Sequence, residues 1–308
     1  MMNKAIVTGG AGFIGSHLVD RLISENFDVI IIDNLSTGKR ENINSKAEFL
    51  HKDIRDEDIS SIIKSYTPDY IFHLAAQIDV RKSLKEPLWD ENINIQGTLN
   101  LLNAASLAKV KKFIFASTGG AIYGEVENAA EERIPRPLSP YGVAKLTCEH
   151  YLRVYSEWRG LSFTALRYGN VYGPRQDPLG EAGVVGIFCK HLILGEGLVL
   201  YGYGEMIRDY VFVSDVVEAN IKAVERGDGE IYNIGTGKAT SVKELFNILK
   251  DISGGNIEPD YREAREGEIH EIWLNITKAS KELDWEPKVP LKEGLSLAYK
   301  WFQKHLSR

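Results

Sequence analysis

The sequence predicts a doubly wound α/β fold, in which helices cover both faces of a parallel sheet, followed by a second, smaller α/β unit. Apolar runs alternate with helical patterns, a glycine-rich turn separates the first strand from the first helix, and Gly/Pro-rich turns follow residue 167. Alternating strands and helices form parallel sheets with right-handed crossovers. Ligands of such sheets bind beyond the carboxyl ends of the strands. We therefore expect functional residues at that edge.

Six short apolar segments are expected to form this sheet. Each is followed by a turn or a helical pattern, as parallel strands require. They are Ala5–Thr8, Val29–Asp33, Ala47–His51, Tyr70–Leu74, Phe113–Ser117 and Phe163–Arg167.

The first unit is expected to cover residues 1–170, and the second residues 171–308. The second unit should contain helices from Val184 to Leu194 and from Val242 to Asp251, the latter opened by a capping box of Ser241 and Glu244. Residues of about 209–238, with a strand from Ile231 to Ile234, are expected to return to the first unit.

The first turn has the glycine pattern of a dinucleotide site. Gly10, Gly12 and Gly15 satisfy GxGxxG between an apolar strand and the helical run 17–23. In this position bare backbone amides and a helix N-terminus can receive a pyrophosphate. Asp33 ends the second strand about 20 residues later, where a carboxylate accepts ribose hydroxyls. A carboxylate repels a 2′-phosphate, so the pattern favours NAD over NADP.

Tyr141 and Lys145 indicate hydride chemistry. Side chains four apart share a helix face, so the Lys145 ammonium can stabilise an ionised Tyr141 phenol, whose pKa is otherwise about 10. Ser139 is a candidate N-cap and Pro140 a first helical residue, which places Tyr141 at the positive end of the helix. Such a pair also arises by chance on surface helices. The glycine turn favours the catalytic interpretation.

Composition excludes several other classes of protein. A net charge of −6 without a Lys/Arg run argues against general binding of nucleic acid or anionic membranes. Two cysteines without paired spacing and seven scattered histidines predict neither disulfides nor a metal site. No apolar stretch approaches the roughly 18 residues of a membrane span, and the chain enters a strand at once. We expect a soluble, cytoplasmic protein.

These motifs in this order resemble the extended short-chain dehydrogenase/reductases and, within them, the UDP-glucose 4-epimerases. The resemblance implies a Rossmann fold, a tightly bound NAD and a UDP-sugar substrate. It runs through Thr8-Gly9-Gly10, Leu166 to Pro174, Arg208-Asp209-Tyr210, Arg265-Glu266-Gly267-Glu268 and Trp285-Glu286-Pro287.

The resemblance also implies which residues bind the cofactor. Besides the glycine turn and Asp33, they lie at or after the ends of the third, fourth, fifth and sixth expected strands or on helices between these strands. The set is Gly9, Gly12, Phe13, Ile14, Gly15, Asp33, Asn34, Asp53, Ile54, Leu74, Ala75, Ala76, Asn94, Ser117, Tyr141, Lys145 and Tyr168.

The nucleotide half of the substrate is assigned by the same resemblance. Arginines suit a diphosphate because their planar fork makes paired, charge-assisted hydrogen bonds. Ile272 stands where the family gates its sugar pocket, and its intermediate size leaves glucose and N-acetylglucosamine both open. The implied set is Thr118, Asn170, Arg208, Arg265, Glu268 and Ile272.

One position departs from the family. Gly119 stands where the family has its catalytic Ser or Thr, so the hydroxyl must come from Thr118 or, as second choice, Ser117. Both hydroxyls could instead satisfy backbone groups at a strand end. The next residues, 120–122, are Gly, Ala and Ile, which cannot transfer protons as dehydratases and decarboxylases of this family require.

The resulting hypothesis is reversible oxidation at C4 of the sugar, with Tyr141 as base, Lys145 as its electrostatic partner and Thr118 as hydrogen-bond donor. Two alternatives stay open: an NAD(P)-dependent sugar-nucleotide reductase and a non-catalytic NAD-sensing interaction protein. The resemblance also implies a homodimer, formed through helices at about 88–108 and 140–158.

Overall fold

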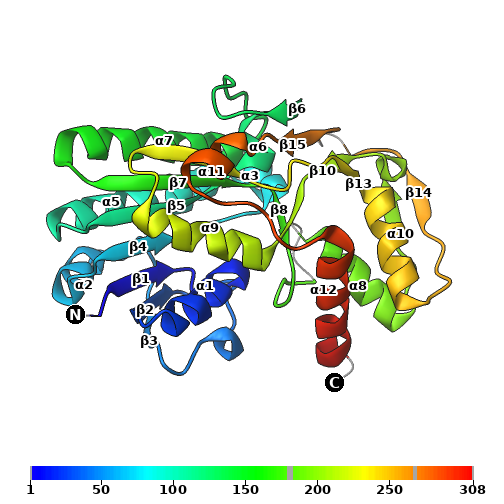
Figure 1. The fold of residues 1–308 in the computed structure, drawn as a ribbon, viewed down its shortest axis with the longest axis horizontal. Coiled ribbons are helices and arrows are strands. Elements are labelled where there is room, and N and C mark those ends of the chain that lie inside the picture. The colour runs from blue at the N-terminus through cyan, green and yellow to red at the C-terminus, as the bar shows by residue number, and fades with distance from the viewer. Residues whose placement is uncertain (1, 179–182, 266–268, 307–308) are drawn as a thin grey trace.

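The computed structural model describes residues 2–178, 183–265 and 269–306, and its centre is a parallel sheet of seven strands (Figure 1). The strand order is β12-β7-β5-β4-β1-β2-β3, as in doubly wound folds. The strands are β1 (Lys4–Thr8), β2 (Asp28–Asp33), β3 (Glu48–His51), β4 (Tyr70–His73), β5 (Lys112–Thr118), β7 (Ser162–Tyr168) and β12 (Glu230–Ile234). All six expected strands are confirmed, and the strand expected at 231–234 is the seventh.

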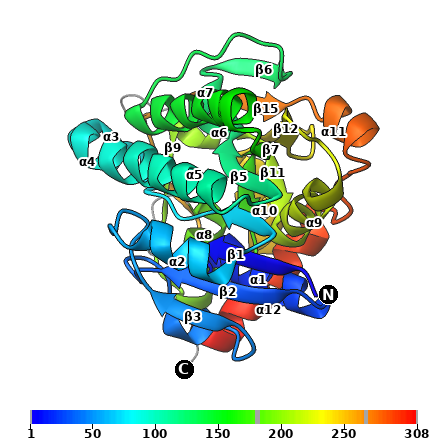
Figure 2. The same cartoon turned by 90° about the vertical axis from the view of Figure 1, so that its left-hand side faces the viewer.

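Helices pack on both faces of this sheet (Figure 2). Apolar side chains of α1 (Phe13–Ser24) and α9 (Val213–Glu225) fill the core on one face. Those of α2 (Ile59–Tyr66), α5 (Gly97–Leu107) and α7 (Pro140–Arg159) fill the other. Burying both faces explains why the central strands are apolar throughout rather than alternating.

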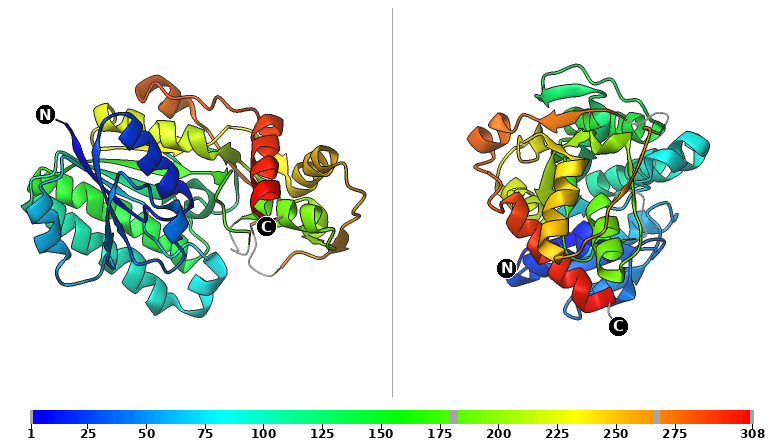
Figure 3. Two further views of the ribbon diagram at one scale, coloured as in Figure 1. Left: turned by 90° about the horizontal axis from the view of Figure 1, so that it is seen from below. Right: turned by 90° about the vertical axis from the view of Figure 1, so that its right-hand side faces the viewer.

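A smaller α/β unit lies at one end of the sheet (Figure 3). Its own core is formed mainly by α8 (Val184–Leu194), α10 (Val242–Ser253) and α12 (Leu291–Leu306). Two short strand pairs belong to it: β9 (Val199–Tyr201) with β14 (Asp260–Arg262), and β10 (Ile207–Arg208) with β13 (Thr240–Ser241).

The remaining elements lie mostly around the carboxyl edge of the sheet. Two more parallel pairs are β8 (Asn170–Tyr172) with β11 (Tyr210–Phe212), and β6 (Val126–Ala129) with β15 (Ile272–Leu274). The helical pieces are η1 (Arg40–Asn42), α3 (Val80–Lys85), α4 (Pro87–Glu91), the π-helical η2 (Asn92–Gln96), α6 (Gly119–Ile122), η3 (Gly202–Gly204) and α11 (Thr277–Glu282). Along the described stretches, no helix is both long and apolar enough to cross a membrane.

Asp209 fastens the region between the two units. Its carboxylate accepts hydrogen bonds from the backbone nitrogen and hydroxyl of Thr236, each 2.7 Å, and from the nitrogens of Gly237 at 3.0 Å and Leu274 at 3.3 Å. The loop after β12 and strand β15 are thereby held against the β10–β11 junction. Four donors offset much of the cost of burying this carboxyl group.

Candidate active site

The glycine turn after β1 has no room for side chains. Gly9 has φ +71°, and a Cβ there would lie 2.7 Å from the backbone nitrogen of Ala75, in the loop after β4. A Cβ on Gly15 would lie 2.1 Å from the carbonyl oxygen of Gly9. The turn therefore leads directly into α1, and the N-terminus of this helix lies just beyond the carboxyl end of β1. Close backbone and a helix N-terminus are what a pyrophosphate requires, so the residues present fit a dinucleotide.

Asp33 is fixed at the end of β2, on the same edge. Its Oδ2 accepts from the backbone nitrogen of Ala11 at 3.0 Å, and its Oδ1 from that of Leu35 at 2.8 Å. Each carboxylate oxygen has capacity for a further donor. These two hydrogen bonds fix the carboxylate at the carboxyl edge of the sheet.

The residues at the ends of β2 and β3 also meet. Asn34 donates to Asp53 across 2.8 Å, and the Arg55 guanidinium lowers the pKa of Asp53 to about 2. Ile54 differs from its neighbours, because its side chain packs in the core. Its carbonyl oxygen accepts from Asn100 at 2.8 Å.

Asn94 clamps the loop that follows β4. Its Oδ1 accepts from the backbone nitrogen of Gln77 at 2.9 Å, and its Nδ2 donates to the Gln77 carbonyl at 3.0 Å. The segment Leu74, Ala75, Ala76 is half-buried between this clamp and the glycine turn. Asn94 lies in the π-helical turn η2, and π-turns are frequent at functional sites.

The predicted catalytic residues converge. Thr118 ends β5 and Tyr141 lies in the first turn of α7, where the Thr118 hydroxyl acts on the pKa of the Tyr141 phenol. Ser139 caps α7 as expected, accepting from Gly142 at 3.2 Å. Gly142 lets the helix approach closely, because a Cβ there would lie 2.4 Å from the Ala121 carbonyl oxygen.

The pKa of Tyr141 is raised in this structure, which runs against the effect expected from Lys145. Burial raises it, the nearby Asp90 raises it further, and the Thr118 hydroxyl opposes both. The Lys145 ammonium donates instead to the carbonyl oxygen of Ala116, 2.8 Å away. Burial lowers the pKa of Lys145 to about 8.

Thr118 and Ser117 have different partners, which favours Thr118 as the acting hydroxyl. Ser117 donates to Glu149 Oε1 at 2.6 Å. Glu149 in turn forms a buried, bidentate ion pair with Arg167, with contacts of 2.9 and 2.6 Å. Arg167 also donates to the Tyr123 hydroxyl at 2.6 Å. Sequence reasoning missed this network, although Arg167 in an apolar strand and Glu149 four residues after Lys145 were available signals.

Leu274 occupies the space beside Gly119. A Cβ on Gly119 would lie 2.7 Å from both methyl carbons of Leu274, so a Ser or Thr does not fit without displacement. A Cβ on Gly120 would instead meet Asn170 Oδ1 at 3.7 Å and Thr118 Oγ1 at 4.0 Å, which are ordinary distances. Gly120 therefore faces the polar groups of the site.

The two predicted arginines lie in the smaller unit or beside it. Arg208 donates to the carbonyl oxygens of Ile269 at 2.6 Å and His270 at 3.1 Å. The Arg265 guanidinium lies 3.6 Å from the Tyr201 ring centroid and lowers the pKa of that phenol.

Three further residues were predicted to bind the cofactor or the substrate. Two of them are buried, and the third lies outside the described residues. Tyr168 is buried and its hydroxyl hydrogen-bonds Asn220. Ile272 is 2% exposed and packs in an apolar cluster with Tyr123, so its side chain does not stand at an open pocket. Glu268 lies outside the described residues.

Residues 5–235 match the NAD dependent epimerase/dehydratase family. The chain belongs to this family. NAD is accordingly the cofactor of this epimerase/dehydratase, in agreement with the glycine turn and Asp33.

Three solved structures resemble this family member over nearly its whole length. A UDP-glucose 4-epimerase from Thermotoga maritima, solved with UDP-glucose, is 52% identical with a TM-score of 0.97, covering 98% of this chain and 99% of its own. A UDP-glucose 4-epimerase from Thermus thermophilus, in complex with NAD, is 42% identical with a TM-score of 0.94, covering 97% and 99%. A UDP-N-acetylglucosamine 4-epimerase from Methanobrevibacter ruminantium, in complex with UDP-N-acetylmuramic acid, is 38% identical with a TM-score of 0.93, covering 99% and 100%.

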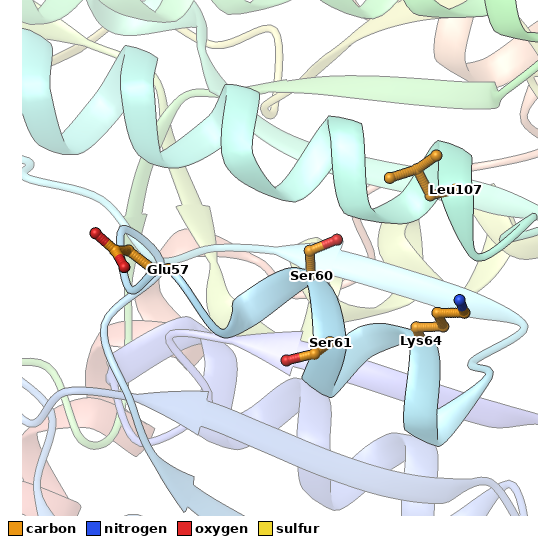
Figure 4. Close-up of a pocket in the computed structure, with 5 residues that line it drawn as sticks. All are labelled: Glu57, Ser60, Ser61, Lys64 and Leu107. Carbon is orange, nitrogen blue, oxygen red and sulfur yellow. The ribbon is translucent and has the colours of Figure 1, made fainter.

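Two further observations concern possible sites elsewhere on this epimerase/dehydratase. Over the described ranges, no three His, Cys, Asp or Glu side chains are grouped to hold a metal ion. A surface hollow between α2 and α5 is lined by none of the predicted site residues (Figure 4). Its lining is Glu57, Ser60, Ser61, Lys64 and Leu107.

Proposed function

We propose that the protein is an NAD-dependent sugar-nucleotide 4-epimerase that interconverts UDP-glucose and UDP-galactose through a transient 4-keto sugar. The observation that carries this proposal is the pairing of Thr118, at the end of β5, with Tyr141, in the first turn of α7, beside the buried Lys145 at the edge where the glycine turn opens. The solved relatives named for this reaction support it.

The chain's own residues supply acid/base chemistry and orientation. Bound NAD supplies a reversible hydride acceptor. Tyr141 takes the proton of the sugar 4-hydroxyl, and Thr118 donates to the oxygen as it becomes a carbonyl. The 4-keto sugar turns over, and reduction of its other face, with the proton returned by Tyr141, gives the epimer without net redox change.

Charge at the site decides when Tyr141 can act. Its raised pKa means that the phenol is protonated at neutral pH in the protein alone. Base catalysis therefore needs positive charge close to this oxygen. The bound nicotinamide and the Lys145 ammonium are the two sources that this proposal offers.

We assign NAD to the glycine turn, Asp33 and the segment 74–76, within residues 1–170 and the returning segment of about 209–238. The sugar nucleotide is assigned to residues 171–308. Arg208 and Arg265 are its proposed diphosphate ligands, because both lie beside the smaller unit and carry bidentate donors.

The residues that follow β5 distinguish epimerisation from elimination reactions. Gly120 faces Thr118 and Asn170 and presents no acid or base. Elimination needs proton transfer at this position, so reversible oxidation at C4 is the reaction that these groups support.

The test is incubation of the purified protein with UDP-galactose and with UDP-N-acetylgalactosamine, separately and without added cofactor. Epimerisation of either sugar identifies the substrate series and shows that NAD is retained. Consumption of added NADH in proportion to product would instead indicate the reductase, and NAD binding without turnover the sensor. Tyr141→Phe should lower turnover by several decades, and the matched control Tyr151→Phe on the same helix should not. Wild-type rates in Tyr141→Phe would reject the mechanism.

We also propose a homodimer and a cytoplasmic location. Exposed apolar side chains gather on α3, α4 and α7: Leu84, Leu88, Val143, Val154 and Trp158. Such a contiguous apolar face favours a partner surface, and α7 packs against both other helices. Light scattering should give twice the chain mass, and Leu88→Asp with Trp158→Asp should halve it, whereas Ile134→Asp, at another exposed apolar residue, should not. Both cysteines are buried and free, which fits a reducing compartment.

A further inference from the structure

Asp90, on the short helix α4, is a buried carboxyl group for which the mechanism above has no role. It is 1% exposed. Its Oδ1 accepts hydrogen bonds from Gln77 Nε2 at 2.8 Å and Asn94 Nδ2 at 3.1 Å. Its Oδ2 is buried and has no hydrogen-bond partner among the described residues. Burying a half-satisfied carboxyl group is costly, so a compensating role is expected.

The groups that face Asp90 belong to the catalytic helix. Its helix α4 packs against α7, and Asp90 shifts the pKa of three groups on α7: Tyr141, Lys145 and Cys148. From α3, Lys82 turns to the neighbouring Trp89, with its Nζ 3.7 Å from the ring centroid. The two amides bonded to Oδ1 carry no charge, so the charge of Asp90 acts chiefly on α7.

Asp90 and Lys145 favour each other's charged form. Burial raises the pKa of Asp90, while the two amide hydrogen bonds and Lys145 lower it. Burial alone would depress the pKa of Lys145 further, and Cys148, Asp90 and Glu149 together oppose this, leaving it at about 8. Without the carboxylate, the ammonium would lose its proton closer to neutral pH.

Asp90 also holds the segment that borders the glycine turn. Asp90 accepts a hydrogen bond from Gln77. This residue ends the loop that begins at Ala75, which lies in close contact with Gly9. Asn94 binds the same loop through the Gln77 backbone. One carboxylate thus joins the cofactor-side loop to the catalytic helix.

We propose that Asp90 is a positioning residue of the reaction, whose negative charge keeps the Lys145 ammonium protonated at neutral pH while its hydrogen bonds hold Gln77 and Asn94 in place. The inference rests on the proposed function for its kinetic consequence. Its electrostatic part does not depend on that function.

The test is Asp90→Asn, which keeps the shape and the Oδ1 acceptor and removes the charge. We expect the alkaline limb of the pH profile of kcat to move toward acid by about one unit, which corresponds to a loss of about 1.4 kcal/mol of charge interaction. KM and retained NAD should stay at wild-type values. Glu91→Gln, the same charge change one residue away on α4, should move neither limb. An Asp90→Asn profile that superimposes on wild type, or a loss of kcat without a shift, would overturn the proposal.

A second readout separates this inference from the proposed function. If the wild-type protein has no epimerase activity, the proposed function is rejected. The role of Asp90 is then tested by the pH dependence of unfolding stability. Because the folded pKa of Lys145 lies below its unfolded value, stability should rise with pH from about 8 upward. In Asp90→Asn this rise in stability should begin about one pH unit lower. Asp90→Ala should show the same shift, and it replaces Asp90→Asn in the test if that variant folds poorly. An unchanged onset in both variants would reject the electrostatic role.

Discussion

Replacing Gly119 by Ser introduces a hydroxyl at the position where the family resemblance implies a catalytic Ser or Thr, and we expect it to destabilise the protein. A Cβ on Gly119 would stand 2.7 Å from both methyl carbons of Leu274, whereas ordinary contacts begin at 3.4 Å. The atoms must therefore separate by the difference, 0.7 Å. Overpacking of this kind costs about 1–3 kcal/mol.

A double-mutant cycle isolates the contact. Leu274 is 1% exposed, so Leu274→Ala alone should cost about 2–5 kcal/mol through the cavity that it leaves. In the double variant the serine enters that cavity, and the combined loss should be smaller than the sum by about 1–2 kcal/mol. Urea denaturation followed by tryptophan fluorescence measures all four stabilities.

Gly120→Ser is the matched control, because its Cβ meets nothing closer than 3.7 Å. It should retain wild-type stability. Thr118→Val removes the proposed hydroxyl donor, and we expect it to lower kcat by about 100- to 1,000-fold. Adding Gly119→Ser to this variant should not restore its activity. A Gly119→Ser protein as stable as wild type, with additive effects in the cycle, would refute the packing argument.

Three other predictions concern the cofactor turn and the buried charges. Gly15→Ala should abolish retained NAD, measured by absorbance after denaturation, because its Cβ would lie 2.1 Å from the Gly9 carbonyl oxygen; a variant with full NAD content would contradict this. Glu149→Gln should cost about 3–5 kcal/mol by leaving Arg167 buried without its ion-pair partner. The double change of Glu149 and Arg167 to Leu and Met should cost less in the same urea titration, and equal costs would contradict it. Lys145→Met should be inactive yet more stable at neutral pH, by at most about 3 kcal/mol for a pKa shift from 10.5 to about 8, and melting curves from pH 7 to 10 should lose the rise that wild type shows.

The sequence predicted the features whose signals are local. Strands, turns and the α7 cap depend on neighbouring residues, and the i, i+4 spacing was sufficient to place Tyr141 and Lys145 on the same helix. The short parallel pairs were missed, because strands of three residues such as β8 and β11 are too short to show a period. Asp90 was missed for another reason: Lys145 is far from it in sequence, and the two come near each other only through the packing of α4 on α7.

The choice between Ser117 and Thr118 shows the same limit at the scale of one residue. Neither hydroxyl stands at the family position, which Gly119 occupies, and what separates the two is Glu149, 32 residues further along the chain than Ser117, which Ser117 binds. The family pattern also suggested that Ile272 gates the sugar pocket, but the bonding of Leu274 to Asp209 fixes β15 so that Ile272 packs inward. Such outcomes depend on tertiary contacts that spacing alone does not encode.

Burial has opposite consequences for the two groups on which the chemistry depends. It favours the neutral form of each, which raises the pKa of Tyr141 and lowers that of Lys145. A buried phenol and a buried amine left alone would make a poor base and a weak electrostatic partner. The pair therefore depends on charges from outside α7. Asp90 favours the ammonium but disfavours the phenolate, so the Lys145 ammonium alone leaves Tyr141 protonated. NAD, when bound, would supply the further positive charge, which would couple proton transfer to cofactor binding.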